Sequence, residues 1–330
     1  AVVPSVLRER IDQVILGQVL PAACGMNIAR QTALRLGIRQ ASPAFMVNMV
    51  CGSGLKAVAL GADAIAAGES DLVLAGGAES MSSAPHYQRD LRWGRKLGDA
   101  ALEDAIFVDA LTDPLLKISM GETAERLADQ YQISRDAQDA FALRSQLLAA
   151  GSVDAFRREI VPVKTREGVV EIDEHPRADT TQEKLAKLKP AFRPQGTITA
   201  GNASGINDGA ALVLLASEEA VSRHHLTPRA RVVATCAVGC SPEIMGIGPV
   251  AAIRSLCDRT GTALDQIDLL ELNEAFAAQA LACCAELGLN MERVNPRGGA
   301  IALGHPVGAS GARVLVTLLH NLEDRGVSRG

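Results

Sequence analysis

Two residues suited to nucleophilic catalysis, Cys51 and His305, stand at corresponding points of two similar stretches of this chain. Cys51 follows the apolar run 11–16 and opens the sequence CGSGLKAVALGADAIAAG. His305 follows the run 267–272 at nearly the same separation and lies within GGAIALGHPVGASGARVLVTLL. Each position is typical of a strand-to-helix junction. A duplicated fold that brought the two junctions together would set a thiol beside an imidazole.

The neighbours of Cys51 favour a reactive thiol. A cysteine directly before Gly-Ser-Gly and an apolar helix would stand at the helix N-terminus, where the dipole and free backbone N–H groups favour the thiolate. A cysteine after an apolar strand is more often simply packed in a core. The presence of His305 favours a reactive thiol over a packed one. The small neighbours of His305 contribute little apolar area, so packing does not explain it, and imidazole can accept a thiol proton near neutral pH.

Asn273 is a third candidate. The sequence Asn273-Glu274-Ala275-Phe276 follows an expected strand at 269–272 and begins an expected helix at about 274–287. Ligands of α/β sheets bind at the carboxyl ends of strands, and an amide there can hold a water or a developing oxyanion. Asparagine is also a common N-cap, and both interpretations stay open at this point.

Composition excludes several classes of protein. A chain of 330 residues predicts two or three packed units, and a net charge of -5 with 3% aromatic residues argues against nucleic-acid or membrane-surface binding. The seven cysteines form no CxxC pair and no zinc-type spacing with histidine, so no metal is implied. No apolar stretch is long enough to span a bilayer. With free cysteines and no signal peptide, we expect a cytoplasmic protein.

Strands and helices alternate at both ends of the chain. Strands are expected at 14–19, 44–50, 72–75, 211–216, 231–238 and 269–272, and helices at 55–67, 249–260, 274–287 and 307–322. This alternation predicts α/β units with largely parallel sheets. Between them lies a more polar stretch with two expected helices, capped by Ser119 and Ser134. It is interpreted as an insertion into the first half.

Six motifs together resemble the thiolase family over essentially the whole chain. They are VCGSGLKAV around Cys51, LAGGAESMS at 74–82, MGETAE at 120–125, GTITAGNASGINDGAA at 196–211, NEAFAAQA at 273–280 and GGAIALGHPVGASGAR at 298–313. The resemblance implies a thiolase-like α/β fold with two duplicated halves, mixed sheets and buried helices. It places the N-terminal half at 1–80 and 206–227, an inserted CoA-binding loop domain at 81–205 and the C-terminal half at 228–330.

The resemblance also implies roles for individual residues. Cys51 would be the nucleophile that accepts an acyl group from acyl-CoA, and His305 the base that activates it. Asn273 would hold the water that forms an oxyanion hole together with His305. Three further residues would bind substrate: Ser204 would line the tunnel for the pantetheine of CoA, Arg177 would meet its nucleotide end, and Met120 would lie at the same site.

The implied reaction is ping-pong acyl transfer between CoA thioesters. It would run as cleavage of 3-ketoacyl-CoA or as condensation of two molecules of acetyl-CoA. CoA would be a substrate and not a cofactor, acyl-CoA and CoA would be the small-molecule partners, and the chain would form a homodimer or homotetramer. Ser119 stands where acetoacetyl-CoA-forming members carry histidine, so the preferred acyl chain length stays open.

Two departures from the family pattern leave alternative functions open. The family begins about one βα unit earlier and ends with a Cys-x-Gly segment whose cysteine is the second acid/base, so we expect the chain to belong to a longer thiolase. The alternatives are a catalytically incomplete thiolase-like protein that binds CoA or lipid, and a ketoacyl synthase that uses an acyl-carrier protein. The asparagine in NEAF, where synthases carry histidine, favours a thiolase.

Overall fold

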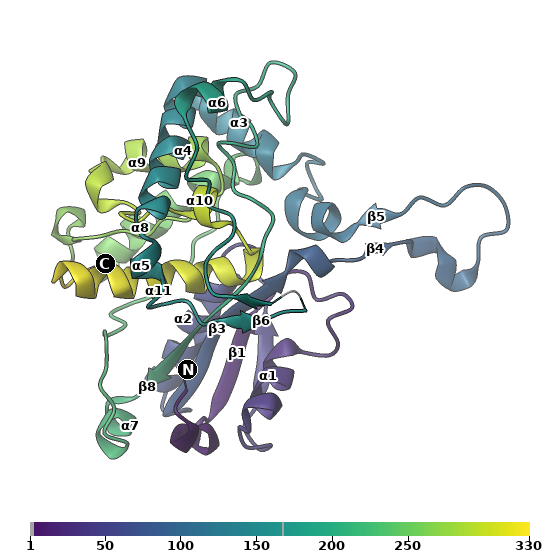
Figure 1. Cartoon of the computed structure of the whole chain (residues 1–330). Coiled ribbons are helices and arrows are strands. Elements are labelled where there is room, and N and C mark those ends of the chain that lie inside the picture. The colour runs from purple at the N-terminus through teal and green to yellow at the C-terminus, as the bar shows by residue number, and fades with distance from the viewer. Residues whose placement is uncertain (1–2, 167) are drawn as a thin grey trace.

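The computed structural model describes residues 3–166 and 168–330. Ala1, Val2 and Glu167 belong to the expected domain ranges but lie outside the described residues. A sheet with its helices forms one part of the molecule, and a group of helices forms the other (Figure 1). The long helix α11 (Val307–Arg325) runs across the middle, between these two parts.

The sheet has four strands in the order β2-β1-β3-β8, with bounds Ala44–Val47, Gln13–Gly17, Leu72–Ser80 and Asp208–Ala216. β1 pairs in parallel with β2 and with β3, whereas β8 is antiparallel to β3. The expected α/β architecture is therefore present, as a mixed sheet. The return of the chain to β8 after the polar stretch agrees with an insertion between β3 and β8.

Both faces of the sheet are covered, which explains why β1 is a continuous apolar run. Val14 and Leu16 pack on the side of α1 (Ile28–Leu36), and Ile15 packs on the side of α2 (Ser53–Ala66). Side chains alternate between the two faces of a strand, so a strand buried on both faces needs apolar residues at every position. The expectation that the helix after Cys51 is central is confirmed, because α2 packs both on the sheet and against α11.

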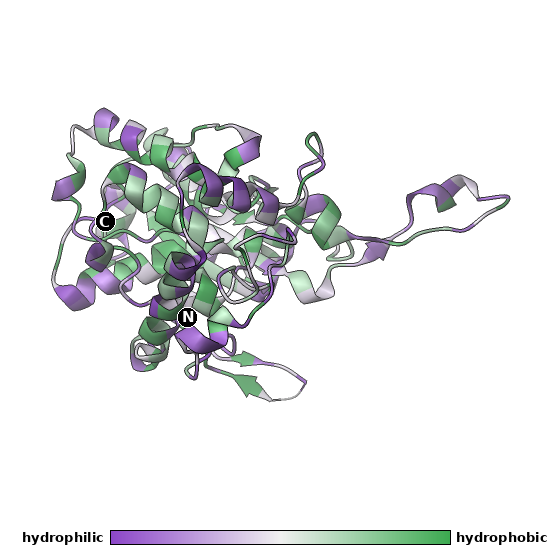
Figure 2. Ribbon diagram, turned by 90° about the horizontal axis from the view of Figure 1, so that it is seen from above, coloured by the Kyte–Doolittle hydropathy of each residue, from purple (hydrophilic) through white to green (hydrophobic). Residues whose placement is uncertain are grey.

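The inserted stretch contains the two capped helices that the sequence predicts. Ser119 accepts a hydrogen bond from the backbone N–H of Glu122 at the start of α3 (Met120–Gln130). Ser134 does the same for Ala137 in α4 (Arg135–Ala150). Glu122 does not complete a capping box but forms two hydrogen bonds with Arg193, at 2.8 Å each. An arm between β4 (His86–Tyr87) and β5 (Glu103–Asp104) projects far from the body (Figures 1 and 2).

The strands expected in the second half are wrong for the described residues. Positions 231–238 form no strand, and 269–272 contribute a single bridge between Leu270 and Val294. The reason is the lack of a pairing neighbour: Val232, Val233 and Val238 are 45%, 78% and 44% exposed, and an extended segment becomes a strand only when its backbone groups are paired. The flanking helices α8 (Gly248–Thr260) and α9 (Ala277–Leu287) do form.

The remaining elements are short. The helices are α5 (Val153–Phe156), α6 (Gln182–Ala186), α7 (Glu218–Arg223) and α10 (Ala300–Leu303), and the strands are β4 (His86–Tyr87), β5 (Glu103–Asp104), β6 (Val163–Lys164) and β7 (Val169–Val170). Short 3₁₀ helices cover Ser5–Arg10, Met81–Ser83, Arg89–Trp93, Pro242–Ile247, Leu264–Gln266 and Met291–Arg293, and a short π-helix covers Phe107–Leu111. Across the described ranges, no helix combines the length and apolar character needed to cross a membrane.

Candidate active site

Cys51 stands in a tight turn between β2 and α2. The preceding residue, Val50, has a φ of 47°, a left-handed conformation that is strained for a β-branched side chain. Ser53 holds the turn, because its Oγ donates to the carbonyl of Val50 at 2.6 Å and accepts from the N–H of Met49 at 2.8 Å. The turn therefore holds the Cys51 side chain just before the start of α2.

His305 stands in a second tight turn, between α10 and α11. Gly304 before it has a φ of 93°, and a Cβ there would collide with the side chain of Asn207. The Oδ1 atom of Asn207 accepts a hydrogen bond from the backbone N–H of His305 at 3.3 Å. Pro306 follows and precedes the first residue of α11. The imidazole is thus delivered at a helix start, in the same way as the thiol.

The two turns meet. The Nε2 atom of His305 lies 3.2 Å from the Sγ atom of Cys51, although the two residues are 254 positions apart in sequence. The contact depends on how closely α2 and α11 approach. A Cβ on Gly54 would lie 2.8 Å from the backbone nitrogen of Ala312, and a Cβ on Gly311 would lie 2.5 Å from that of Leu55. Glycine at both positions permits the crossing that brings the thiol to the imidazole.

Ser310 sets the proton position on the imidazole. Its Oγ atom lies 2.6 Å from Nδ1 of His305 and donates its own proton to the carbonyl of Pro306 at 2.9 Å. A hydroxyl has one proton, so Oγ must accept from Nδ1, which therefore carries hydrogen. Nε2 is then the unprotonated nitrogen that faces Cys51. This is the tautomer that a base acting on the thiol requires.

Burial keeps both partners neutral. Removal from water raises the pKa of the partly buried Cys51 thiol to about 11, and a backbone hydrogen bond offsets only part of this rise. Burial, followed by the nearby positive charge of Arg313, lowers the pKa of His305 to about 4. The expectation of a thiolate favoured by the helix N-terminus is therefore wrong for the resting site, because burial raises the pKa of the thiol more than the backbone hydrogen bond lowers it. Thiol and imidazole instead form a neutral pair.

Asn273 lies beside this pair. Its Nδ2 atom is 3.4 Å from both ring nitrogens of His305, and its buried Oδ1 atom has no hydrogen-bond partner among the described residues. The next residue, Glu274, anchors the segment: it is fully buried and bonds to Ser145 Oγ at 2.6 Å and Asn295 Nδ2 at 2.8 Å. Asn273 does not cap α9, since the helix starts at Ala277.

Two of the three expected substrate-binding residues adjoin the Asn273 segment. Met120 packs in one apolar cluster with Ala203, Ala275 and Phe276. The backbone N–H of Ser204 donates to the carbonyl of Ala275 at 3.0 Å. Met120 and Ser204 therefore both lie beside the segment that carries Asn273.

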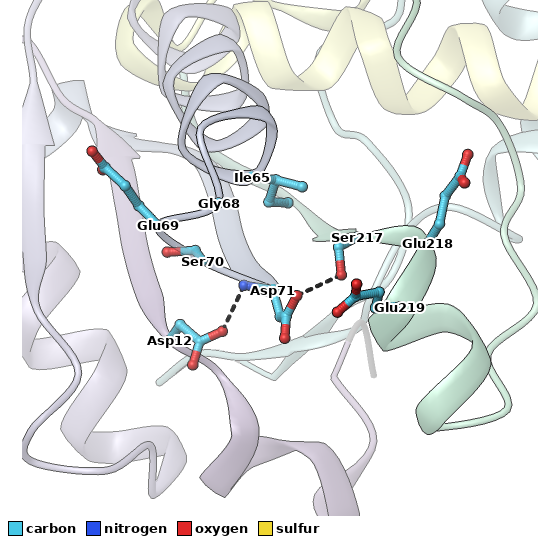
Figure 3. A pocket seen from close by; sticks show the side chains of 9 residues that line it. All are labelled: Asp12, Ile65, Gly68, Glu69, Ser70, Asp71, Ser217, Glu218 and Glu219. Atoms are coloured by element: carbon cyan, nitrogen blue, oxygen red, sulfur yellow. Dashed lines mark hydrogen bonds between the residues drawn. The ribbon is translucent and has the colours of Figure 1, made fainter.

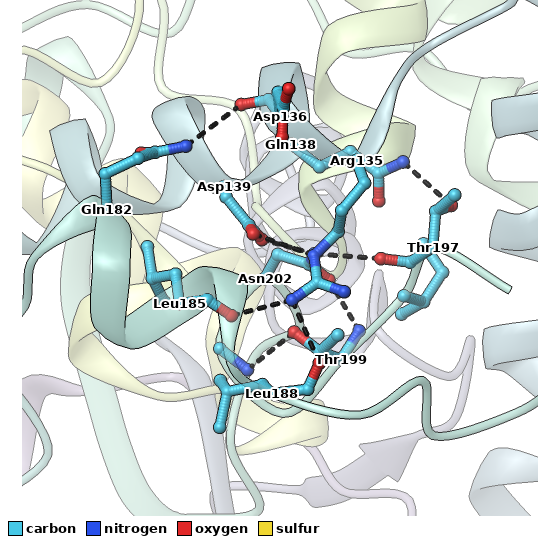
Figure 4. A network of polar contacts seen from close by, with 12 residues as sticks. Arg135, Asp136, Gln138, Asp139, Gln182, Leu185, Leu188, Thr197, Thr199 and Asn202 are labelled. Atoms are coloured by element: carbon cyan, nitrogen blue, oxygen red, sulfur yellow. Dashed lines mark hydrogen bonds and ion pairs between the residues drawn. The ribbon is translucent and has the colours of Figure 1, made fainter.

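A polar network holds the loop that bears Ser204 (Figure 4). The buried Asn202 donates to Asp139 Oδ1 at 2.9 Å and accepts from the N–H of Thr199 at 2.8 Å. Arg135 donates to the other oxygen of Asp139 at 2.7 Å. These bonds tie the loop to α4, a helix of the inserted stretch.

Arg177 is less closely joined to the site. It is exposed, and its backbone N–H donates to Oε1 of Gln146 at 2.8 Å. Gln146 in turn donates to the carbonyl of Ile301 in α10 at 3.2 Å. Arg177 is thus connected to the turn of His305 through α10, with its guanidinium available to solvent.

A cavity of about 590 Å³ lies elsewhere, beyond the C-terminal end of α2 (Figure 3). It is lined by Asp12, Ile65, Gly68, Glu69, Ser70, Asp71, Ser217, Glu218 and Glu219. Cys51 precedes the opposite end of this 14-residue helix, which at 1.5 Å per residue is about 20 Å long. The acidic cavity is therefore separate from the thiol and the imidazole.

Sequence reasoning missed Ser310 and Asn207. Ser310 is one of the small residues after His305, and its position five residues along does not by itself indicate a contact with the ring. Asn207 lies in the Asn-Asp-Gly sequence after the glycine-rich loop, which signals a turn. Neither pattern shows which backbone group the side chain will reach.

Comparison with known proteins agrees with this arrangement. Residues 3–219 match the family described as "Thiolase, N-terminal domain", and residues 226–330 match "Thiolase, C-terminal domain". An acetyl-CoA acetyltransferase of Chromobacterium violaceum is 51% identical over 329 residues, which cover 98% of this chain and 84% of that protein. One of Pseudomonas aeruginosa is also 51% identical, over 328 residues covering 97% and 84%.

Solved structures superpose closely on nearly the whole chain. The crystal structure of the Bacillus anthracis acetyl-CoA acetyltransferase superposes with a TM-score of 0.94 at 45% identity, covering 98% of this chain and 83% of that one. Human mitochondrial 3-ketoacyl-CoA thiolase in complex with CoA gives a TM-score of 0.94 at 45% identity, covering 97% and 82%. The expected thiolase-like α/β fold is confirmed. The chain belongs to the thiolase family of acyltransferases.

Proposed function

We propose that this protein transfers acyl groups between CoA thioesters in two half-reactions, with the acyl group carried on Cys51. The observation that carries the proposal is the 3.2 Å contact between the Cys51 thiol and the unprotonated Nε2 of His305. The names of the similar proteins, acetyl-CoA acetyltransferase and 3-ketoacyl-CoA thiolase, support acetyl-CoA and 3-ketoacyl-CoA as substrates. The substrates follow from this likeness, and the order of steps follows from the site chemistry.

In the first half-reaction, Sγ of Cys51 attacks the thioester carbonyl carbon as its proton passes to Nε2 of His305. Because both groups are neutral at rest, attack and proton transfer are coupled, and no free thiolate accumulates. The tetrahedral intermediate collapses with cleavage of the carbon–sulfur bond to CoA. The departing CoA sulfur takes the proton from Nε2, which leaves acyl-Cys51 and neutral His305.

Asn273 is proposed to stabilise the negative charge that develops on the carbonyl oxygen. Its amide lies 3.4 Å from the imidazole, and its Oδ1 atom is free to hold a water that donates to that oxygen. The second half-reaction uses the acyl enzyme as donor. CoA attack regenerates acyl-CoA, as the CoA thiol proton passes to Nε2 of His305 and then to the departing Cys51 sulfur. Condensation needs in addition a base that takes a proton from the α-carbon of acetyl-CoA before that carbon displaces Cys51, the role that the family pattern gives to the cysteine of its Cys-x-Gly segment.

CoA itself is proposed to lie along the inserted stretch, with Met120 and Ser204 beside its pantetheine and Arg177 at its nucleotide end. An exposed guanidinium is suited to phosphate, which it can bind with two parallel hydrogen bonds. Replacement of Arg177 by alanine should raise KM for acetyl-CoA about tenfold and leave kcat nearly unchanged, because the nucleotide contact is the same in ground and transition states. Arg223→Ala, which alters an exposed arginine paired with Asp71, is the matched control.

The two-step transfer is tested by exchange of labelled CoA into acetyl-CoA. A ping-pong enzyme catalyses this exchange without a second acyl substrate, since the first half-reaction is reversible. We expect exchange with the wild type and none with Cys51→Ala. Equal exchange by both proteins would overturn the assignment of Cys51, and transfer from an acyl-carrier protein in place of acyl-CoA would point to a ketoacyl synthase.

Self-association and location are also proposed. β2 forms an edge of the sheet, and Phe45, Met49 and Val50 on or beside it are 37%, 45% and 42% exposed, which favours burial against a second copy in a dimer or tetramer. Light scattering after gel filtration would give the mass. All seven cysteines are free, which supports a reducing compartment such as the cytoplasm.

A further inference from the structure

Glu79 is a buried carboxylate that the proposed reaction does not use. It lies near the end of β3 and is 4% exposed. Its Oε2 atom accepts hydrogen bonds from the backbone N–H groups of Val19 at 2.8 Å and Gly308 at 3.0 Å, and its Oε1 atom accepts from Leu20 at 3.1 Å. One side chain thus satisfies three backbone donors from two segments far apart in sequence.

The two segments belong to opposite sides of the active site. Val19 and Leu20 follow β1, which pairs with the β2 strand that leads to Cys51. Gly308 is the second residue of α11 and follows His305 by three positions. The first N–H groups of a helix have no partner within the helix and carry partial positive charge, so a carboxylate is well suited to bind there. Glu79 therefore ties the helix of His305 to the strand frame that holds Cys51.

The same residues enclose the thiol. Cys51 packs in an apolar cluster with Val19, Leu20 and Val307. Glu79 bonds to the backbone of the first two and to Gly308, the neighbour of the third. A Cβ on Gly308 would lie 2.7 Å from Glu79 Oε2 and 2.8 Å from the Cα of Gln18. The start of α11 therefore lies so close to Glu79 and Gln18 that no residue larger than glycine fits at position 308.

We infer that Glu79 is a positioning residue that holds the Nε2 atom of His305 at hydrogen-bonding distance from the Cys51 thiol. It touches neither group and acts through the start of α11. Coupled proton transfer requires close approach of donor and acceptor, and a displacement of about 1 Å can lower a rate by about 100-fold. The inference rests on the proposed roles of Cys51 and His305.

The test is a double-mutant cycle on the rate of Cys51 acylation by acetyl-CoA. Glu79→Gln keeps the shape of the side chain but turns an N–H₂ group toward one of the three donors. We expect it to slow acylation about tenfold in the wild-type background and less than about twofold in the His305→Ala background, since a residue that acts through His305 has nothing left to position. Glu79→Asp, which is one methylene too short to span the three donors, should behave in the same way.

Glu125→Gln is the matched control. Glu125 is 1% exposed and also accepts backbone hydrogen bonds, from Thr197 and Ile198 at 2.9–3.0 Å. Its loss should lower the melting temperature without changing the pH profile of Cys51 alkylation by iodoacetamide. In the Glu79 variants, alkylation at neutral pH should fall toward the level of His305→Ala.

Three results separate the possible failures. Equal slowing by Glu79→Gln in both backgrounds would mean that Glu79 acts on stability alone and would overturn the inference. Unchanged acylation in both Glu79 variants would also overturn it. Absence of acylation in the wild type itself would contradict the proposed function, and the alkylation profile would then still report whether Glu79 affects the thiol–imidazole pair.

Discussion

At the scale of single residues, the reactive groups are the Cys51 thiol and the His305 imidazole, which form a neutral hydrogen-bonded pair. Burial raises the pKa of Cys51 to about 11 and lowers that of His305 to about 4, so neither group is charged near neutral pH. Such a thiol is a weak nucleophile unless His305 takes its proton. It becomes a nucleophile when a substrate carbonyl is in place and the proton can pass to His305 as the bond forms.

Ser310→Ala tests the tautomer argument. Without the 2.6 Å contact to Nδ1, the imidazole can place its proton on either nitrogen and can rotate, so the fraction with Nε2 free falls. We expect the rate of Cys51 acylation to drop about 10- to 100-fold, with little change in KM for acetyl-CoA. Rapid quench with mass detection gives the rate. Ser217→Ala, which removes the cap of α7, should leave it unchanged, and an equal loss in both variants would refute the role of Ser310.

At the scale of elements, the site is built from two turns and one helix crossing. One turn joins β2 to α2, the other joins α10 to α11, and the crossing is that of α2 with α11. α2 and α11 approach closely because glycine stands at the crossing, and each helix carries its reactive residue just before its first turn. The geometry of the pair is therefore a property of how two helices pack. Small movements of either helix change the distance between Sγ and Nε2.

Gly54→Ala should separate the pair. The added Cβ would lie 2.8 Å from the backbone nitrogen of Ala312 and 3.0 Å from the carbonyl of Gly308, and backbone cannot yield as a side chain can. We expect acylation to slow at least about tenfold and stability to fall by about 1–3 kcal/mol.

Gly61→Ala, in the same helix, is the control for this prediction. Its Cβ would meet the side-chain ends of Leu215 and Val73, at 2.8 and 3.0 Å. The stability loss should be similar or smaller, and the acylation rate should stay near that of the wild type. If Gly61→Ala slows acylation as much as Gly54→Ala does, the crossing is not what sets the distance.

The elements differ in how far the sequence predicts them. Helices α3 and α4 were predictable because Ser119 and Ser134 cap them locally. The junctions of Cys51 and His305 were predictable because strand, glycine and apolar helix follow one another in the chain. The conformation of the segment 231–238 was not predictable. Its apolar residues are typical of a strand, but a strand forms only where a neighbouring segment pairs with it. The contacts of Asn207 and Glu79 depend on where a distant backbone group lies, and the contact of Ser310 depends on how the imidazole of His305 is turned; no local pattern encodes either.

At the scale of the whole molecule, the partly buried carboxyl group of Glu271 joins the 267–272 run to α11. Burial raises the pKa of Glu271 to about 8, and the nearby negative charges of Glu274 and Glu159 add to this, while Arg313 opposes it. Glu271 lies at the end of the 267–272 run and accepts a hydrogen bond from Asn321 of α11 at 2.8 Å. Folding therefore depends on the charge state of this interior group.

The stability should fall as pH rises. The folded pKa of Glu271 lies above the unfolded one, so the folded protein retains a proton that the unfolded chain releases; the stabilisation is complete below the unfolded pKa and is lost as pH approaches 8. Glu271→Gln keeps the acceptor for Asn321 and removes the ionisation. Relative to wild type, it should gain about 1–3 kcal/mol between pH 5 and 8, measured by urea unfolding. The exposed control, Glu292→Gln, should show no such gain, and a constant difference across this range would contradict the assignment.

The most direct test of the central claim is the intact mass of the protein after incubation with acetyl-CoA. We predict that the wild type gains one acetyl group, that proteolysis locates it on Cys51, and that Cys51→Ala gains none. His305→Ala should acquire the group at least about 100-fold more slowly, because the buried thiol then has no base. An adduct of equal size and rate on Cys51→Ala would contradict the account.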